Sequence, residues 1–239
     1  MSFPRGSLFD FDTANTHTDF HSRYDVQIAR IHVESHVFEL LTVRDTNALL
    51  ETIHPHTFTV DERLPYWAEL WPSSIGLARY CVEEVSLLGK KVLDLGCGLG
   101  LAGIAAAKAG AHVVFADYEA DALQFARYNA LSNLGAEVVD SRIEFQLVDW
   151  RCDTIEPVDL VLGADLVYER RSFLPILNFL RQSLKTNGMA VFADPGRSTG
   201  MAFFALAEQE GFRVSLGSRS VKNANKTLDI LIGELRRDE

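Results

Sequence analysis

Three glycines at alternate positions, Gly96, Gly98 and Gly100, follow a short apolar segment that contains Asp94. Glycine has no Cβ, so the backbone can turn sharply there and approach a ligand closely. The helix expected just after this turn would present unpaired N–H groups suited to a carboxylate. The Asp94 carboxylate could in turn orient an ammonium group. The pattern therefore predicts a site for a small molecule that carries both groups, as an amino acid does.

The same glycines permit two other interpretations. Residues 98–103 match the G-x-G-x-x-G pattern of dinucleotide-binding turns. In those turns the first glycine lies where the strand ends, a position that Gly96 takes here, and the third glycine position then holds Leu101. A dinucleotide site is therefore disfavoured, whereas a tight turn that binds no ligand stays open.

Acidic residues follow the next two predicted strands. Asp117 comes where a carboxylate can accept hydrogen bonds from both ribose hydroxyls, although it could equally cap the next helix. Asp149 could accept from an adenine amino group, and Trp150 could pack on the base or simply belong to the core. Because the ends of parallel strands meet at one edge of a sheet, we expect Asp94, Asp117 and Asp149 to face a common crevice shaped for an adenosyl ligand.

A sheet must position these residues, and from Pro72 onward predicted strands alternate with predicted helices. Strands are expected at 90–95, 112–116, 144–148, 159–164, 189–193, 212–216 and 227–235. Helices are expected after Ser73 or Ser74, one of which would cap the first, and at 101–109, 119–133, 171–186 and 199–210. This alternation predicts an α/β fold with a doubly wound, mostly parallel seven-strand sheet and helices on both faces. Only a loop (217–226) separates the last two strands, which favours an antiparallel last strand.

The chain is expected to have three segments. Residues 1–20 are polar and should be poorly ordered. Residues 21–71 form an N-terminal extension, in which the alternation over 24–43 predicts two short strands with a turn near residues 34–35. The rest of the extension is expected to be loops, the last of them on the substrate side. Residues 72–239 form the domain that carries the glycine turn.

The aromatic end of the extension has two interpretations. Tyr66, Trp67 and Glu69 could form a rim on the substrate side of the site. Trp67 could instead be a buried anchor for the extension, and we favour this second interpretation.

The formal net charge of −10 gives the chain an acidic average, whereas proteins that bind nucleic acids usually display a basic stripe. No apolar run approaches the roughly 20 residues that cross a bilayer, and the first residues do not form a secretory signal. Cys81, Cys97 and Cys152 have the spacing of neither a disulfide framework nor a metal site. We expect a cytoplasmic protein that contacts neither nucleic acid nor membrane and binds no metal.

Over about residues 64–239, the chain resembles the class I, seven-strand methyltransferases, and within them the protein-lysine methyltransferases. The likeness rests on Trp71-Pro72 before the first helix, Asp149-Trp150 after the third strand, and residues 163–168 at the fourth strand. Residues 194–197 also resemble a segment of the members that modify an electron-transfer flavoprotein subunit.

The resemblance implies S-adenosyl-L-methionine as cofactor and a protein substrate that presents a lysine. The residues expected to bind the cofactor are Trp71, Asp94, Gly96, Gly98, Gly100, Asp117, Asp149, Trp150 and Ala164.

Asp165 and Tyr168 are the candidate catalytic residues. We expect Asp165 to hold the incoming ammonium by a charge-assisted hydrogen bond and Tyr168 to form an aromatic wall of the lysine channel. Asp165 could otherwise be an ordinary loop acid and Tyr168 a packing residue. Arg197 could hold a substrate carboxylate or merely fix its own loop, and we assign it no role at this point.

Other acceptors are less well matched by the sequence. The Asn/Asp-Pro-Pro-Tyr/Phe motif typical of enzymes that methylate amines of nucleic acids is absent, because Asp165-Leu166-Val167-Tyr168 contains no proline. Neither Cys97 nor Cys152 is placed as the nucleophile of a cytosine-C5 enzyme. A small-molecule N-methyltransferase remains the alternative, since the same fold and the same acidic clamp would serve it.

Overall fold

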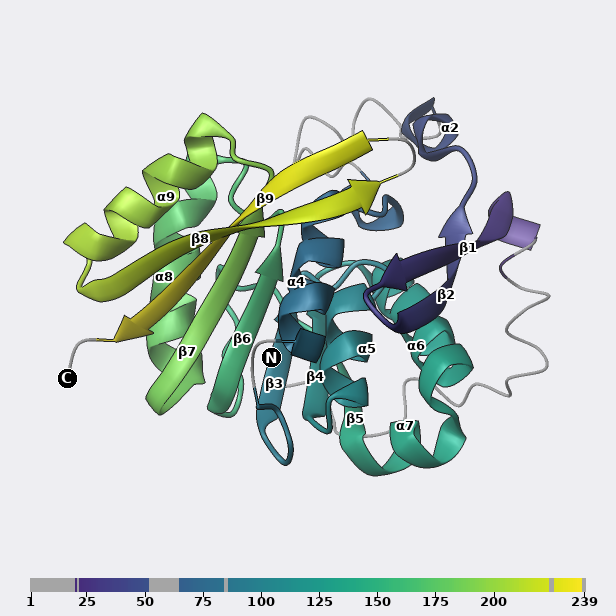
Figure 1. Cartoon of the computed structure of the whole chain (residues 1–239), viewed down its shortest axis with the longest axis horizontal. Coiled ribbons are helices and arrows are strands. Elements are labelled where there is room, and N and C mark those ends of the chain that lie inside the picture. The colour runs from purple at the N-terminus through teal and green to yellow at the C-terminus, as the bar shows by residue number, and fades with distance from the viewer. Residues whose placement is uncertain (1–19, 21, 52–64, 84–85, 224–225, 238–239) are drawn as a thin grey trace.

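The computed structural model describes residues 20, 22–51, 65–83, 86–223 and 226–237. Nearly all of the segment expected to be poorly ordered, and most of the loops expected after residue 51, lie outside these described residues. The remaining elements are built around one large sheet (Figure 1).

The central sheet has seven strands. Their order across the sheet is β5 (Ile143–Leu147), β4 (His112–Asp117), β3 (Lys91–Leu95), β6 (Val158–Ala164), β7 (Leu184–Asp194), β9 (Lys226–Arg237) and β8 (Phe212–Asn223). Strand β9 is antiparallel to β7 and to β8, and the pairs from β5 to β7 are parallel. This confirms the predicted doubly wound sheet with an antiparallel last strand.

Helices cover both faces of the sheet (Figure 1). On one face lie α4 (Pro72–Glu83), α5 (Leu101–Lys108), α6 (Ala120–Leu134) and the short α7 (Ala136–Arg142); on the other lie η2 (Arg170–Ser172), α8 (Phe173–Ser183) and α9 (Ser198–Gln209). Successive strand side chains point to opposite faces. In β3, Val92 therefore packs with α4 and α5, whereas Leu93 and Leu95 pack with α8 and α9.

The strand order reverses between β3 and β6. The chain proceeds from β3 through β4 to β5 in one direction, and from β6 to β7 in the other. Helices that leave adjacent strands on opposite faces open a crevice at the carboxyl ends of those strands, where doubly wound proteins bind ligands. The glycine turn follows β3 and Asp165 follows β6, so both lie at this crevice.

Several predicted boundaries differ from the structure. Helix α4 begins at Pro72, so Ser73 and Ser74 lie inside its first turn and neither caps it. The helix expected at 171–186 ends at Ser183, and β7 begins with Leu184 and continues through Asn187, whose φ is +64°.

Three further features were not predicted. Strand β8 extends over residues 217–223 of the predicted loop, where it pairs with β9. The segment 136–142 forms α7, and Thr46–Glu51 forms the short helix α2 within the region predicted as loops.

The N-terminal extension forms a separate hairpin of β1 (Val26–Val33) and β2 (His36–Val43). Its turn lies at Glu34 and Ser35, as predicted, and Glu34 has a φ of +52°. The hairpin packs against α6 on the side remote from the sheet (Figure 1).

Two asparagine amides on α6 bind the edge of β2 as a neighbouring strand would. The Leu41 N–H donates to Asn129 Oδ1 (2.6 Å), and Asn129 Nδ2 donates to the Leu41 carbonyl (3.2 Å). One helical turn later, Asn133 makes the same pair of bonds with Glu39 (3.0 and 2.7 Å). Asn129 is fully buried and also donates to the carbonyl of Leu99 in the glycine turn (3.0 Å).

Among the described residues, no helix combines the length and the apolar character needed to cross a membrane.

We predict that Asn129→Ala lowers the free energy of unfolding by about 2 to 3 kcal/mol, because buried backbone groups of Leu41 and Leu99 lose their partners. Urea denaturation measures the loss. Asn133→Ala is the matched control and should lose no more than about 1 kcal/mol, since water can replace its more exposed amide. An equal loss in both variants would contradict the proposed role of burial.

Candidate active site

The glycine turn has a backbone that only glycine adopts readily. The φ angles of Gly96, Gly98 and Gly100 are +60°, +51° and +86°. A Cβ on Gly96 would lie 2.5 Å from Leu166 Cδ2, and one on Gly98 would lie 3.1 Å from the carbonyl oxygen of Trp67. Helix α5 begins directly after Gly100, which has no side chain to cap it. The glycines therefore let the turn pack closely against Leu166 and Trp67, and the turn leads into a helix N-terminus.

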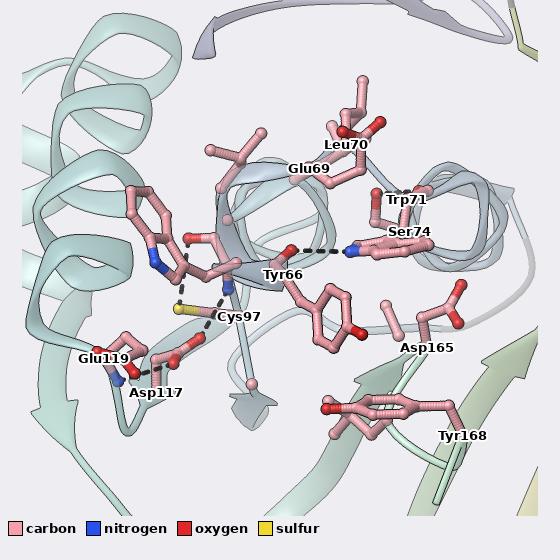
Figure 2. A pocket seen from close by; sticks show the side chains of 18 of the residues that line it. Tyr66, Glu69, Leu70, Trp71, Ser74, Cys97, Asp117, Glu119, Asp165 and Tyr168 are labelled. Atoms are coloured by element: carbon pink, nitrogen blue, oxygen red, sulfur yellow. Dashed lines mark hydrogen bonds between the residues drawn. The ribbon is translucent and has the colours of Figure 1, made fainter. Parts of the chain in front are cut away.

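A pocket of about 240 Å³ lies over this turn. Figure 2 shows Asp117 and Glu119 on one side of it, Trp71, Asp165 and Tyr168 on the other, and Tyr66 between them. The predicted site residues that line it are Trp71, Gly96, Gly98, Gly100, Asp117, Trp150, Ala164, Asp165 and Tyr168. The structure thus brings together nine residues from five separate segments of the chain.

Asp94 does not line the pocket, contrary to the expectation of a shared crevice. It alternates with Leu93 and Leu95, so its side chain points toward α5, where it accepts a hydrogen bond from the Gly103 N–H (2.9 Å). Burial raises the pKa of Asp94 to about 8. The Asp94 carboxyl group therefore stabilises the first turn of α5 through this hydrogen bond.

Asp117 lines the pocket and braces its wall. Its carboxylate accepts from the Gly98 N–H and from the Glu119 N–H, both at 3.0 Å. Burial raises the pKa of Asp117 to about 6, although these two hydrogen bonds oppose the shift. It thus holds the backbone just before α6 while lining the pocket, but it does not cap the helix, whose N-cap residue is Glu119.

Asp149 also lies outside the pocket lining, which corrects the expectation for a third carboxylate there. Its carboxylate forms an ion pair with Arg151 (2.7 Å). The neighbouring Trp150 does line the pocket, edge-to-face with Tyr118 at 6.3 Å between ring centroids. Its indole Nε1 is buried and has no hydrogen-bond partner among the described residues.

Asp165 is held in a buried ionic cluster after β6. It has a φ of +59°, unusual for a residue with a side chain, and is 5% exposed. The Ser73 hydroxyl donates to its Oδ2 (2.8 Å), and the Arg197 guanidinium contacts its Oδ1. A strained backbone held by several partners is typical of functional sites.

Arg197 is a lining residue to which the sequence assigned no role. Its backbone N–H donates to Oδ1 of the fully buried Asp194 (2.6 Å), and its guanidinium lies 3.4 Å from Asp194 Oδ2. Burial raises the pKa of Asp194, an effect that Arg197 opposes. The guanidinium also lies over the Trp71 ring, 5.9 Å from its centroid.

Three aromatic rings surround this cluster. Tyr66 is edge-to-face with both Tyr168 (5.5 Å) and Trp71 (6.0 Å). The Trp71 Nε1–H donates to the Tyr66 carbonyl (2.9 Å), which fixes the two rings relative to each other. Tyr66 and Tyr168 are 41% and 40% exposed, so this side of the pocket opens to solvent.

Trp67 anchors the extension and also lines the pocket. Its ring packs against Phe125 of α6 (5.2 Å) and Tyr24 (5.9 Å), which anchors the extension. It also lines the pocket, together with Tyr66 and Glu69 of the predicted rim.

The sequence reasoning missed further lining residues, among them Leu70, Ser74, Cys97, Leu99, Tyr118 and Glu119. Each lies within a few residues of a predicted one, so the turns already identified could have indicated them. Burial raises the pKa of the Cys97 thiol well above its ordinary value, so this cysteine stays a neutral thiol. Within the described part of the chain, no cluster of His, Cys, Asp and Glu could hold a metal ion.

Solved structures of methyltransferases share this fold. The chain superposes on the N-methyltransferase NodS from Bradyrhizobium japonicum, solved with S-adenosyl-l-homocysteine, with a TM-score of 0.56 and 17% identity over 81% of this chain and 99% of that one. At that identity, the comparison supports the fold alone, and it agrees with the predicted class I architecture.

Curated relatives are more similar in sequence. The electron transfer flavoprotein beta subunit lysine methyltransferase of Danio rerio is 38% identical over 141 residues, 56% of this chain and 51% of that protein. The histidine protein methyltransferase 1 homolog of Dictyostelium discoideum is 34% identical over 131 residues, 52% of this chain and 41% of that protein. The chain thus spans about half the length of these relatives.

The family model described as lysine methyltransferase matches residues 63–210, which is more than half of the chain and includes all of the pocket-lining residues named above. This confirms the resemblance found in the sequence. The chain belongs to the lysine methyltransferase family.

Proposed function

We propose that this protein transfers a methyl group from S-adenosyl-L-methionine to the side-chain nitrogen of a lysine in another protein. The observation that carries the proposal is the single pocket that joins the glycine turn and Asp117 to Asp165 and its aromatic walls. The names of several relatives, which specify lysine as the acceptor, support it.

The chemistry of the pocket fits this cofactor on its glycine side. Gly96, Gly98 and Gly100 line the pocket with backbone alone, and the N-terminus of α5 suits the carboxylate of its methionine end. Asp117 would accept hydrogen bonds from the ribose hydroxyls.

The other residues predicted to bind the cofactor would contribute to the site either directly or indirectly. Trp150 would lie at the adenine base of the cofactor and Ala164 at its methionine end. The Trp150 Nε1–H, which is buried and unpartnered among the described residues, would be available as a hydrogen-bond donor. Trp71 lies on the acceptor side of the pocket (Figure 2). We propose that Asp94 acts indirectly, by fixing the start of α5. Asp149 would bind the cofactor only if its ion pair with Arg151 breaks.

The acceptor side suits an amine. When bound, the cofactor supplies a methyl group attached to a cationic sulfur, which a neutral nitrogen can attack. Asp165 would accept a hydrogen bond from the substrate nitrogen, since a carboxylate oxygen can accept more than one bond. Tyr168, Tyr66 and Trp71 would enclose the aliphatic stem and attract the charged form by cation–π interaction. The exposure of Tyr66 and Tyr168 leaves a path for a side chain that enters from another protein.

We predict that the purified protein, incubated with radiolabelled S-adenosyl-L-methionine and a lysate of its host, labels a protein band. Hydrolysis of that band should release methylated lysine. We further propose that the reaction occurs in the cytoplasm, where Cys81, Cys97 and Cys152 would stay unpaired, so the acceptor should fractionate with cytosolic proteins. Label confined to small molecules would favour the alternative, a small-molecule N-methyltransferase, and label on histidine or arginine would overturn the choice of lysine.

We predict that Asp165→Ala reduces methyl transfer at least 100-fold but changes the affinity for S-adenosyl-L-homocysteine by less than about threefold, because the acceptor, Ser73 and Arg197 lose a partner whereas the glycine turn does not. Label incorporation and isothermal titration calorimetry measure the two quantities separately. Glu169→Ala is the control, because this carboxylate pairs with Arg171 outside the pocket lining and should leave both unchanged. Unchanged transfer in the Asp165 variant would refute its role.

We predict that Gly98→Ala weakens S-adenosyl-L-homocysteine binding at least tenfold, because the new Cβ would press on the Trp67 carbonyl at the pocket wall. Gly135→Ala is the matched control: Gly135 has a φ of +81° and open space around it, and it does not line the pocket. Gly135, with a ψ of 159°, has a backbone that essentially only glycine adopts, so Gly135→Ala is the more strained variant, but only Gly98→Ala should lose affinity. Equal affinities in calorimetric titrations would argue against a ligand at this turn.

A further inference from the structure

Arg197 places a permanent positive charge inside the proposed acceptor site. Its guanidinium contacts Asp165, approaches Asp194 and lies over Trp71. The backbone N–H bond to Asp194 fixes the residue just before α9. An arginine side chain does not lose its proton in proteins, so this charge persists at every pH at which the enzyme could work.

The charges that face this point come from several elements. Asp165 follows β6 and Asp194 ends β7, and both carboxylates approach the same guanidinium nitrogen, Nη1 of Arg197. Tyr66 and Tyr168 stand on the open side, while Glu69 and Asp117 line the more distant walls of the pocket. Burial raises the pKa of Tyr168 to about 12, so this phenol is neutral at physiological pH.

A site made only of carboxylates and aromatic rings would hinder the reaction that it serves. Both kinds of group stabilise the ammonium form of lysine, whose ordinary pKa is about 10.4. That form has no lone pair with which to attack a methyl group. A positive charge close to the nitrogen has the opposite effect, since it disfavours a second cation.

We propose that Arg197 is a positioning residue that compensates the charge of Asp165, so that the bound lysine gives up its proton and reacts as the neutral amine. Asp165 can then orient the nitrogen through a hydrogen bond without holding it as an ammonium ion. The proton passes to water, the nitrogen lone pair forms a bond to the methyl carbon, and the carbon–sulfur bond breaks with its electron pair left on sulfur. This inference rests on the proposed function.

The first test is the pH dependence of methyl transfer to the protein band that the wild type labels. Arg197→Gln should move the rising midpoint of kcat/KM by about one pH unit toward alkaline pH, and so lower the rate at pH 7 about tenfold. Arg197→Lys, which retains the charge, should keep the wild-type midpoint even if its maximal rate falls.

A double variant separates charge from structure. Arg197→Gln combined with Asp194→Asn removes one positive and one negative charge, so the midpoint should return toward that of the wild type. A merely structural role for Arg197 predicts no such rescue, because the double variant loses more contacts than the single one. S-adenosyl-L-homocysteine affinity, measured for each variant, reports whether the fold and the glycine side remain intact.

The second test needs no turnover. n-Butylamine serves as a lysine side-chain mimic, and its binding to protein saturated with S-adenosyl-L-homocysteine can be followed by NMR. In the wild type its affinity should rise with pH as the neutral amine becomes available. In Arg197→Gln the ammonium form should bind at pH 7 at least several-fold more tightly than in the wild type.

The outcomes distinguish this inference from the function on which it rests. If the wild type transfers no methyl group to any protein, the proposed function fails. If the wild type is active but Arg197→Gln leaves both the midpoint and the butylamine affinity unchanged, only the role of Arg197 is overturned.

Discussion

The buried carboxylate of Asp165 is the interaction on which the geometry of the acceptor side depends. A carboxylate this far from water is strongly destabilising unless it is paired and hydrogen-bonded. Ser73 in the first turn of α4 and Arg197 before α9 satisfy it, so three distant parts of the chain are held at one point. Trp71 immediately precedes α4, and the same pairing therefore places its indole beneath the guanidinium. The carboxylate and the aromatic walls form one unit.

The fold was predictable from the sequence because strands buried on both faces are apolar almost throughout and contrast clearly with the intervening helices. The errors lie where this contrast disappears. Residues 185–187 of β7 are polar and exposed, and the preceding helix was predicted to continue to residue 186. Residues 217–223 of β8, which were predicted as a loop, place Val221 in the core and pair with the predicted strand β9, but a single buried apolar side chain is too little to indicate a strand.

The site was predictable to the extent that strand ends meet at one edge of the sheet. This rule placed Asp117 at the pocket, whereas Asp165 and Tyr168, which also line it, were predicted from the family resemblance. The rule does not predict on which face of the sheet each side chain lies. Because side chains alternate between the two faces along a strand, Asp94 points toward α5. The Asp149 carboxylate forms an ion pair with the nearby Arg151 and lies outside the pocket lining. Arg197 could not be assigned, since its pairing with a residue 32 positions earlier exists only in the folded chain.

The N-terminal extension is physically continuous with the cofactor side of the pocket. The Trp67 carbonyl lies against Gly98, and the Trp67 ring packs on Phe125 of α6. From the same helix, Asn129 binds both Leu41 of the hairpin and Leu99 of the glycine turn. A division of the chain at residue 72 follows the change in sequence periodicity, but the contacts cross it. The hairpin, α6 and the turn are thus joined by direct contacts, and the backbone that forms the floor of the pocket is held by residues from both sides of that division.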